Sequence, residues 1–206
     1  MTESLLDRVP VVPVVVVHDV AHAVPLARAL VEGGLPVIEL TLRTPVALDA
    51  IEAIAVEVPE ILVGAGTIVG PGQAKDAQSA GAQFLVSPGT TEALAAAMQD
   101  TGLPHLPGAA TVSEVLRLLE LGYREMKFFP AEAAGGAGFL RSVGAPVPQA
   151  RFCPTGGITA ANAASYLALP NVGCVGGSWL TPPDAVLDGD WARIAQLASE
   201  ATYLAP

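Results

Sequence analysis

The chain has 206 residues, of which 51% are hydrophobic, 15% charged and 5% aromatic, a composition that excludes a disordered chain. Twenty acidic residues against ten Lys and Arg give a net charge of −10, which repels phosphate backbones and anionic lipid, so we expect no nucleic-acid or membrane partner. The length fits one domain over residues 1–206, and a core of aliphatic side chains is typical of strands that are buried on both faces.

Short apolar runs alternate with amphipathic stretches along the whole chain. The predicted strands are residues 11–17, 37–42, 61–65, 84–87, 105–107, 125–129, 151–155 and 172–176. The predicted helices lie near residues 22–33, 45–57, 71–80, 91–100, 111–121, 136–143, 160–168 and 190–202. Eight strands alternating with eight helices through short connections predict an α/β fold with a parallel sheet.

Such a sheet either closes into a barrel or stays open with helices on both faces. The count of eight strand–helix units favours a (β/α)8 TIM barrel, a single domain whose short loops suit a chain at the lower end of the length range for that architecture. An open dinucleotide-binding sheet is disfavoured, because no GxGxxG follows the first predicted strand.

The beginning of the chain and its cysteines bear on location. The apolar run 9–17 has the composition of a signal-peptide core, but acidic residues precede it, two prolines interrupt it, and it is too short to span a bilayer. Cys153 and Cys174 lie in apolar surroundings without CxxC spacing, which indicates neither a disulfide framework nor zinc. We therefore predict a cytoplasmic protein with two small core cysteines.

The predicted strand 37–42 carries an unusual polar face. Because side chains alternate between the two faces of a strand, its apolar set faces the helices, and Glu39, Thr41 and Arg43 face the barrel interior. Buried charges carry a large desolvation cost unless they pair or bind a ligand. The polar set therefore predicts part of an active site at the carboxyl ends of the strands; an edge strand with a polar face is the alternative.

Lys127 is one of only two lysines, and it lies in the apolar predicted strand 125–129. Alternation directs its amine into the barrel together with Phe129. Burial disfavours the ammonium form, and a neutral amine is the nucleophile that attacks a carbonyl to form a Schiff base. The alternative is a structural ion pair of Lys127 with Glu39 that fills the barrel.

Two glycine pairs follow the last two predicted strands. The first pair, Gly156 and Gly157, comes after Thr155, and the second pair, Gly176 and Gly177, is followed by Ser178. Glycine leaves backbone amides unshielded, and the loops after the seventh and eighth strands are where barrels commonly bind phosphate. The loops therefore predict an anion site, against the alternative of tight turns after short strands.

The histidines form no obvious ligand set. His18 and His22 are four residues apart, but no carboxylate completes a site with them, and His105 is remote. Divalent metal sites need three or more converging ligands. We predict no metal site.

The chain resembles the 2-keto-3-deoxy-6-phosphogluconate (KDPG) aldolase and 4-hydroxy-2-oxoglutarate aldolase family over nearly its whole length. The resemblance is carried by seven motifs: Glu39-Leu40-Thr41-Leu42-Arg43-Thr44, Val63-Gly64-Ala65-Gly66-Thr67, Ser87-Pro88-Gly89, Pro107-Gly108, Lys127-Phe128-Phe129-Pro130-Ala131-Glu132, Pro154-Thr155-Gly156-Gly157-Ile158 and Gly176-Gly177-Ser178-Trp179. It implies a class I aldolase, a lyase that uses no metal or cofactor, on a (β/α)8 barrel and as a homotrimer. The implied reaction cleaves KDPG to pyruvate and glyceraldehyde 3-phosphate, and 4-hydroxy-2-oxoglutarate to pyruvate and glyoxylate.

The resemblance also implies a role for each matching position. Lys127 matches the Schiff-base lysine and Glu39 the general acid and base. At the pyruvate end of the substrate, Arg43 matches the arginine that holds the carboxylate, and the residues that match its surroundings are Thr67, Pro88, Phe129 and Thr155. The residues that match the phosphate-binding positions are Gly156, Gly157, Gly177 and Ser178. One departure concerns residues 14–17, all Val, where many relatives carry an Arg that adds a phosphate contact; a smaller one is Ala134, where Asn is common.

Three other functions compete with this interpretation. The first is cleavage of the galactonate epimer of the substrate. The second is a phosphosugar isomerase or synthase that uses Glu39 as a base without covalent attachment. The third is a catalytically silent, self-assembling module, for which the surplus of apolar residues in a short barrel gives some support.

Overall fold

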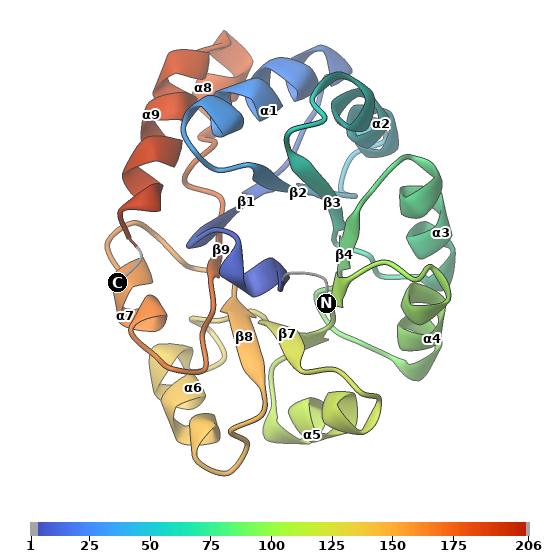
Figure 1. Ribbon diagram of the computed structural model, residues 1–206, viewed down its shortest axis with the longest axis vertical. Helices are drawn as coiled ribbons and strands as arrows, with labels where there is room; N and C mark the ends of the chain where they lie inside the picture. Colours follow the sequence, from blue (N-terminus) through green and yellow to red (C-terminus); the bar gives the residue numbers. More distant parts are fainter. Residues whose placement is uncertain (1–3, 205–206) are drawn as a thin grey trace.

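The computed structural model describes residues 4–204, with the strands at the centre and the helices around them (Figure 1). The strands are β1 (Val11–Val15), β2 (Val37–Thr41), β3 (Leu62–Gly66), β4 (Phe84–Val86), β5 (His105–Leu106), β6 (Gly108–Ala109), β7 (Glu125–Phe128), β8 (Arg151–Pro154) and β9 (Val175–Gly177). The α-helices are α1 (Ala23–Glu32), α2 (Ala47–Glu57), α3 (Pro71–Ser79), α4 (Glu92–Asp100), α5 (Val112–Glu120), α6 (Gly136–Gly144), α7 (Ala163–Leu167), α8 (Pro183–Asp188) and α9 (Trp191–Thr202). Two 3-10 helices, η1 (Leu5–Asp7) and η2 (Val20–His22), complete the described elements.

The strands form two parallel sheets. A curled six-stranded sheet has the order β5-β4-β3-β2-β1-β9, and a three-stranded sheet has the order β6-β7-β8. Isolated parallel bridges join Phe152 to Val172 and Thr155 to Gly176, next to β9. The predicted α/β fold with parallel strands is confirmed.

Three predicted elements differ from the structure. The predicted strand 105–107 is interrupted at Pro107, which has no N–H for a ladder, so β5 and β6 stand on either side of it. The predicted strand 172–176 pairs regularly only over β9, and the predicted helix 160–168 is reduced to α7. Helix α8, which begins with a proline in its first turn, was not predicted.

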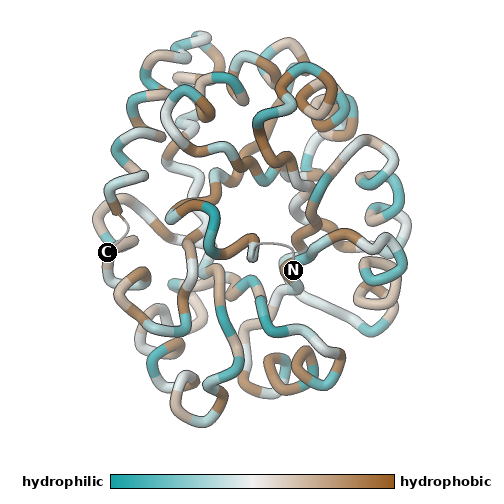
Figure 2. Tube along the Cα trace, viewed as in Figure 1, coloured by the Kyte–Doolittle hydropathy of each residue, from teal (hydrophilic) through white to brown (hydrophobic). Residues whose placement is uncertain are grey.

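The core fills the space between strands and helices with aliphatic side chains. Figure 2 shows hydrophobic colour concentrated on the central strands and hydrophilic colour on the outer surfaces of the helices. On β7, the side chains of Met126 and Phe128 are fully buried toward the helix layer, where the Phe128 ring stacks on Phe139 of α6. The neighbouring positions of the same strand point to the other side, which is what aims Lys127 inward.

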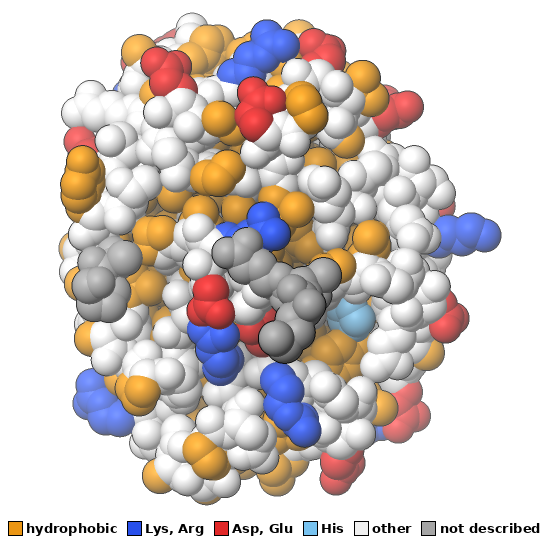
Figure 3. Space-filling model, viewed as in Figure 1, with side chains coloured by type: hydrophobic (Ala, Val, Ile, Leu, Met, Phe, Trp, Pro, Cys, Tyr) orange, Lys and Arg blue, Asp and Glu red, His pale blue; other side chains and the backbone are white. Residues whose placement is uncertain are grey.

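The segment before β1 lies at the amino ends of β7 and β8. Ser4, the N-cap of η1, donates a hydrogen bond to Glu125, the first residue of β7, and Arg151, the first residue of β8, pairs with Asp7. The hydrogen bond from Arg151 lowers the pKa of Asp7. In Figure 3, which shows this face, acidic and basic side chains are scattered rather than gathered by sign. Within residues 4–204, no helix combines the length and apolarity needed to cross a membrane.

Candidate active site

A buried ion pair joins β7 to β2. Nζ of Lys127 donates a hydrogen bond of 3.0 Å to Oε1 of Glu39, and the two residues are only 4% and 2% exposed. Taking two charges out of water costs several kcal/mol per ion unless they pair with good geometry. The structure therefore places the predicted nucleophile and the predicted acid–base residue in direct contact inside the molecule.

The space for this pair depends on a glycine in the neighbouring strand. Glu39 is in register with Gly64 of β3, and a Cβ atom built on Gly66 would overlap the carboxylate of Glu39. Gly66 thus leaves the volume that the carboxylate occupies. Thr41, the next inward residue of β2, has a structural role: its hydroxyl donates to the carbonyl oxygen of Val15 at 2.9 Å.

Arg43 is held at the end of β2 by Thr67. Nε of Arg43 donates to Oγ1 of Thr67 at 3.2 Å. Thr67 has φ of +60°, the left-handed region that a β-branched residue rarely adopts and that costs on the order of 1–3 kcal/mol. Strain of this size concentrates at functional sites, where it fixes a side chain in a needed direction.

A cavity of about 260 Å³ lies at the carboxyl ends of β1, β8 and β9. Six of the predicted site residues form part of its wall: Arg43, Phe129, Thr155, Gly156, Gly157 and Ser178. Nζ of Lys127 lies 5.6 Å from the centre of the Phe129 ring, so the amine is adjacent to this wall. The structure thus places the two predicted anion-binding loops close to the Lys127–Glu39 pair.

Besides Lys127 and Glu39, which do not line the cavity either, three predicted site residues lie outside that wall. Thr67 reaches it only through Arg43, and Pro88 packs against Gly108 of β6, where an added Cβ would overlap the Pro88 backbone. Gly177 is buried in β9 against the ring of Trp179. The structure gives these three positions supporting contacts rather than a place in the cavity wall.

Sequence reasoning missed four residues of the wall: Val14, Val16, Ile158 and Gly176. Val14 and Val16 are half-buried while Val15 and Val17 are buried, an alternation that assigns the first pair to the interior. A uniform run of Val hides this alternation in the sequence. The first strand therefore contributes an apolar wall to the site.

A second cavity of about 270 Å³ adjoins the first and shares Val14, Val16 and Ser178 with it. His18 and His22 lie in its wall, and the His22 ring meets Trp191 edge-on at 5.8 Å. Among the described residues, no group of three or more His, Cys, Asp or Glu is arranged to hold a metal ion.

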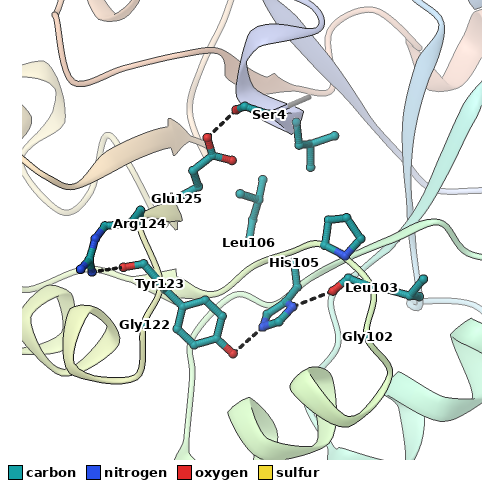
Figure 4. Close-up of a pocket in the computed structure, with 11 residues that line it drawn as sticks. Ser4, Gly102, Leu103, His105, Leu106, Gly122, Tyr123, Arg124 and Glu125 are labelled. Carbon is teal, nitrogen blue, oxygen red and sulfur yellow. Dashed lines mark hydrogen bonds between the residues drawn. The ribbon is translucent and has the colours of Figure 1, made fainter. Parts of the chain in front are cut away.

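A separate cavity of about 560 Å³ lies at the amino ends of β5 and β7 (Figure 4). His105 is held there between the carbonyl oxygen of Leu103, at 2.9 Å from Nδ1, and the hydroxyl of Tyr123. Burial lowers the pKa of His105 and raises the pKa of Tyr123. His105 thus lies apart from the cavity beside Lys127.

Both cysteines are buried and free, as predicted. The hydrogen bond with Cys153, together with burial, raises the pKa of the Cys174 thiol. A thiol held in this form is a poor nucleophile. The cysteines therefore belong to the core.

Comparison with known proteins identifies the family. A family model described as KDPG and KHG aldolase matches residues 2–197. The chain is 55% identical to the KHG/KDPG aldolase of Escherichia coli over 199 residues, which covers 97% of the chain and 93% of that protein. It is 50% identical to the 2-dehydro-3-deoxy-phosphogluconate aldolase of Pseudoalteromonas atlantica over 200 residues, with the same two coverages.

A solved structure agrees with this family. The KDPG aldolase of Legionella pneumophila, with pyruvate captured as a covalent carbinolamine intermediate, superimposes with a TM-score of 0.94 at 47% identity and covers 96% of each chain. The resemblance inferred from the motifs is confirmed. The chain belongs to the KDPG and KHG aldolase family and is an aldolase, a lyase that acts on carbon–carbon bonds.

Proposed function

We propose that the chain is a class I aldolase that cleaves KDPG to pyruvate and glyceraldehyde 3-phosphate, and 4-hydroxy-2-oxoglutarate to pyruvate and glyoxylate. The observation that carries the proposal is the 3.0 Å contact between Lys127 and Glu39 beside the cavity wall. A primary amine next to a proton acceptor, in a site shielded from water, is the arrangement that Schiff-base chemistry requires.

The reaction begins at the Lys127 amine. After Glu39 accepts a proton from it, Nζ attacks the C2 ketone to give a carbinolamine. Glu39 returns the proton to the C2 oxygen, which leaves as water, and a protonated imine and an ionised Glu39 remain. The imine takes up the electron pair of the breaking C3–C4 bond while Glu39 accepts the proton of the C4 hydroxyl, and the aldehyde leaves. Glu39 then returns a proton to C3 of the enamine, and water hydrolyses the imine to release pyruvate and Lys127.

The pyruvate carboxylate is assigned to Arg43. A guanidinium presents a fork of N–H donors that matches a carboxylate, and the bond from Nε to Thr67 directs the rest of the fork. Phe129 and Thr155 complete this end by packing, and Pro88 supports it through its contact with Gly108.

The phosphate is assigned to the loops after β8 and β9. The N–H groups of Gly157 and Ile158 donate no hydrogen bond to any acceptor within residues 4–204, whereas that of Gly156 faces β9 through the Thr155–Gly176 bridge. Gly156 and Gly157 have φ of +100° and +79°, so their amides lie in a concave loop of the kind that binds anions. Ser178, which lines the cavity, belongs to the same proposed site, and Gly177 supports it from β9.

Lactate dehydrogenase coupling tests the substrate. Pyruvate release is followed by NADH oxidation with the gluconate form, the galactonate form and 4-hydroxy-2-oxoglutarate. We expect the gluconate form to be cleaved with the highest kcat/KM. A higher kcat/KM for the galactonate form would transfer the assignment to that epimer.

The second candidate function is that of a non-covalent isomerase or synthase, because the ion pair between Lys127 and Glu39 could also be purely structural. A non-covalent isomerase or synthase would need Glu39 but not the amine. Lys127→Arg keeps the positive charge and removes the nucleophile. Turnover that survives in this variant would favour the non-covalent enzyme.

We further propose that the two sheets are parts of one closed (β/α)8 barrel in a single domain over residues 1–206. The Thr155–Gly176 bridge links the sheets on one side, and on the other β5 and β6 are consecutive through Pro107. A homotrimer in the cytoplasm is proposed on the family resemblance, and light scattering of the purified protein measures the subunit number.

A further inference from the structure

We propose that Asn162, together with the Tyr166–Glu132 pair, fixes the direction of the phosphate-binding amides by holding the carbonyl groups of their own peptide bonds. These are positioning residues, because they act through the backbone of residues 155–158 and not by touching the substrate. The inference rests on the proposed function, since it concerns the anion subsite of that same site.

The planar trans peptide bond couples the direction of each carbonyl group to that of the next N–H group. The C=O of one residue and the N–H of the next belong to one rigid plane and point in opposite directions. A hydrogen bond to the carbonyl on one side of a loop therefore turns the N–H to the other side. In a loop rich in glycine, little else restricts the rotation of these planes.

Three successive carbonyls of this loop are held. The N–H of Ala131 donates to the carbonyl of Thr155 at 2.8 Å, and the N–H of Glu132 donates to that of Gly156 at 3.1 Å. Nδ2 of Asn162 donates to the carbonyl of Gly157 at 3.0 Å. The three N–H groups on the opposite sides of these planes are those of Gly156, Gly157 and Ile158. The first faces β9 through the Thr155–Gly176 bridge, and the other two find no acceptor within residues 4–204.

Asn162 is itself fixed, so it can serve as an anchor. Its Oδ1 accepts a hydrogen bond from the N–H of Thr159 at 2.8 Å, and α7 begins at the next residue. The amide thus bridges the two sides of the 157–159 turn. Asn162 is the only side chain among the three anchors, which makes it the one that a substitution can remove.

The Glu132 anchor has its own support from the core. The hydroxyl of Tyr166, a residue that is 1% exposed, donates to the Glu132 carboxylate. Cγ of Glu132 occupies the place that a Cβ on Gly157 would take, so the side chain lies directly against the loop. Burial and the hydrogen bond to Glu132 raise the pKa of Tyr166, which keeps its proton available for this contact.

The test measures phosphate and pyruvate separately. Inorganic phosphate binding is measured by calorimetry, and pyruvate attachment to Lys127 is measured by borohydride reduction and mass analysis. In Asn162→Ala we expect phosphate affinity to fall roughly tenfold or more, because a charge-assisted set of donors loses its alignment. The extent of pyruvate attachment should stay as in the unmodified enzyme, and KM for KDPG should rise while kcat changes little.

Matched variants separate positioning from folding. Tyr166→Phe removes only the hydroxyl and should weaken phosphate binding less than Asn162→Ala does. Glu132→Gln keeps an acceptor for the Tyr166 hydroxyl and should weaken phosphate binding less than Tyr166→Phe does. Ser142→Ala, which removes another local hydrogen bond from an exposed helical side chain, is the control and should behave like the unmodified enzyme. If Asn162→Ala does not fold, phosphate binding by Tyr166→Phe and Glu132→Gln is compared. Weaker binding in Tyr166→Phe than in Glu132→Gln supports the inference, and binding equal to that of the unmodified enzyme in both overturns it.

Two results would overturn the inference: unchanged phosphate affinity in both Asn162→Ala and Tyr166→Phe, or an equal loss of phosphate binding and pyruvate attachment in Asn162→Ala. Failure of the proposed function is distinct, because the unmodified enzyme itself would then form no pyruvate adduct.

Discussion

Lys127 and Glu39 are 88 positions apart in the chain, yet the amine nitrogen of one lies 3.0 Å from a carboxylate oxygen of the other in a nearly solvent-free interior. Only the alignment of β7 and β2 around a common interior produces this contact. The pair is central to the proposed chemistry, and it is also a point of weakness in the fold, because each buried charge depends on the other for compensation.

Removing one charge of the pair should destabilise the protein more than removing both. Lys127→Met leaves a buried carboxylate without its partner, which costs about 3–5 kcal/mol of the free energy of unfolding. The double variant Lys127→Met with Glu39→Gln removes the uncompensated charge and should recover most of that loss. Urea denaturation of the two single variants and the double variant measures the coupling; additive losses would contradict the account.

Replacement of Gly66 by a residue with a side chain should disturb the position of Glu39 and reduce activity. A Cβ at Gly66 overlaps the Glu39 carboxylate, so Gly66→Ala should displace Glu39 and reduce kcat by at least about tenfold. Gly72→Ala is the matched control, because a Cβ on that exposed helical glycine meets nothing within 4 Å. The control should keep full activity and gain up to about 1 kcal/mol of stability. Equal activity in both variants would show that Glu39 needs no such space.

Replacement of Thr67 by glycine should relieve backbone strain but weaken substrate binding. Thr67→Gly relieves the left-handed backbone but removes the oxygen that holds Arg43, so we expect no loss of thermal stability and a severalfold higher KM. Thr67→Ser keeps the hydroxyl and should retain most of the activity. Steady-state kinetics and thermal unfolding of both variants measure this, and a normal KM in Thr67→Gly would remove the role assigned to the Arg43–Thr67 bond.

His105 should make stability depend on pH near neutrality. Burial lowers its pKa below the usual 6.5, so the unfolded chain takes up a proton before the folded protein does. Its contribution to stability is therefore complete above pH 6.5 and is lost as the pH falls below that value. Thermal unfolding between pH 5.5 and 8 should show a smaller pH dependence in His105→Gln. The exposed His18→Gln is the control, and an unchanged slope in His105→Gln would refute the prediction.

Much of this architecture could be predicted because parallel strands leave a strong sequence signal. Continuous apolar runs separated by amphipathic stretches gave the parallel α/β fold, and Gly81 and Gly122 end their helices with φ of +93°. Glu39 and Lys127 could be predicted as site residues because a charged residue on an otherwise apolar strand is too costly to bury unless it pairs or binds a ligand.

The rest depends on contacts that no local pattern contains. The break at Pro107 and the short β9 reflect how neighbouring strands pair, and Val14 and Val16 carry no polar signal of the cavity that they line. The strain at Thr67 and the anchoring of the Gly157 carbonyl by Asn162 arise from tertiary geometry. These are the features by which the fold positions the groups that the sequence reveals.

The central claim is that Lys127 forms a covalent imine with the substrate ketone. Incubation of the protein with pyruvate and sodium borohydride, followed by peptide mass analysis, measures it most directly. We predict a reduced pyruvyl group on the peptide that contains Lys127 and none on the peptide that contains Lys75. Absence of any adduct, or an adduct on Lys75 alone, would contradict the account.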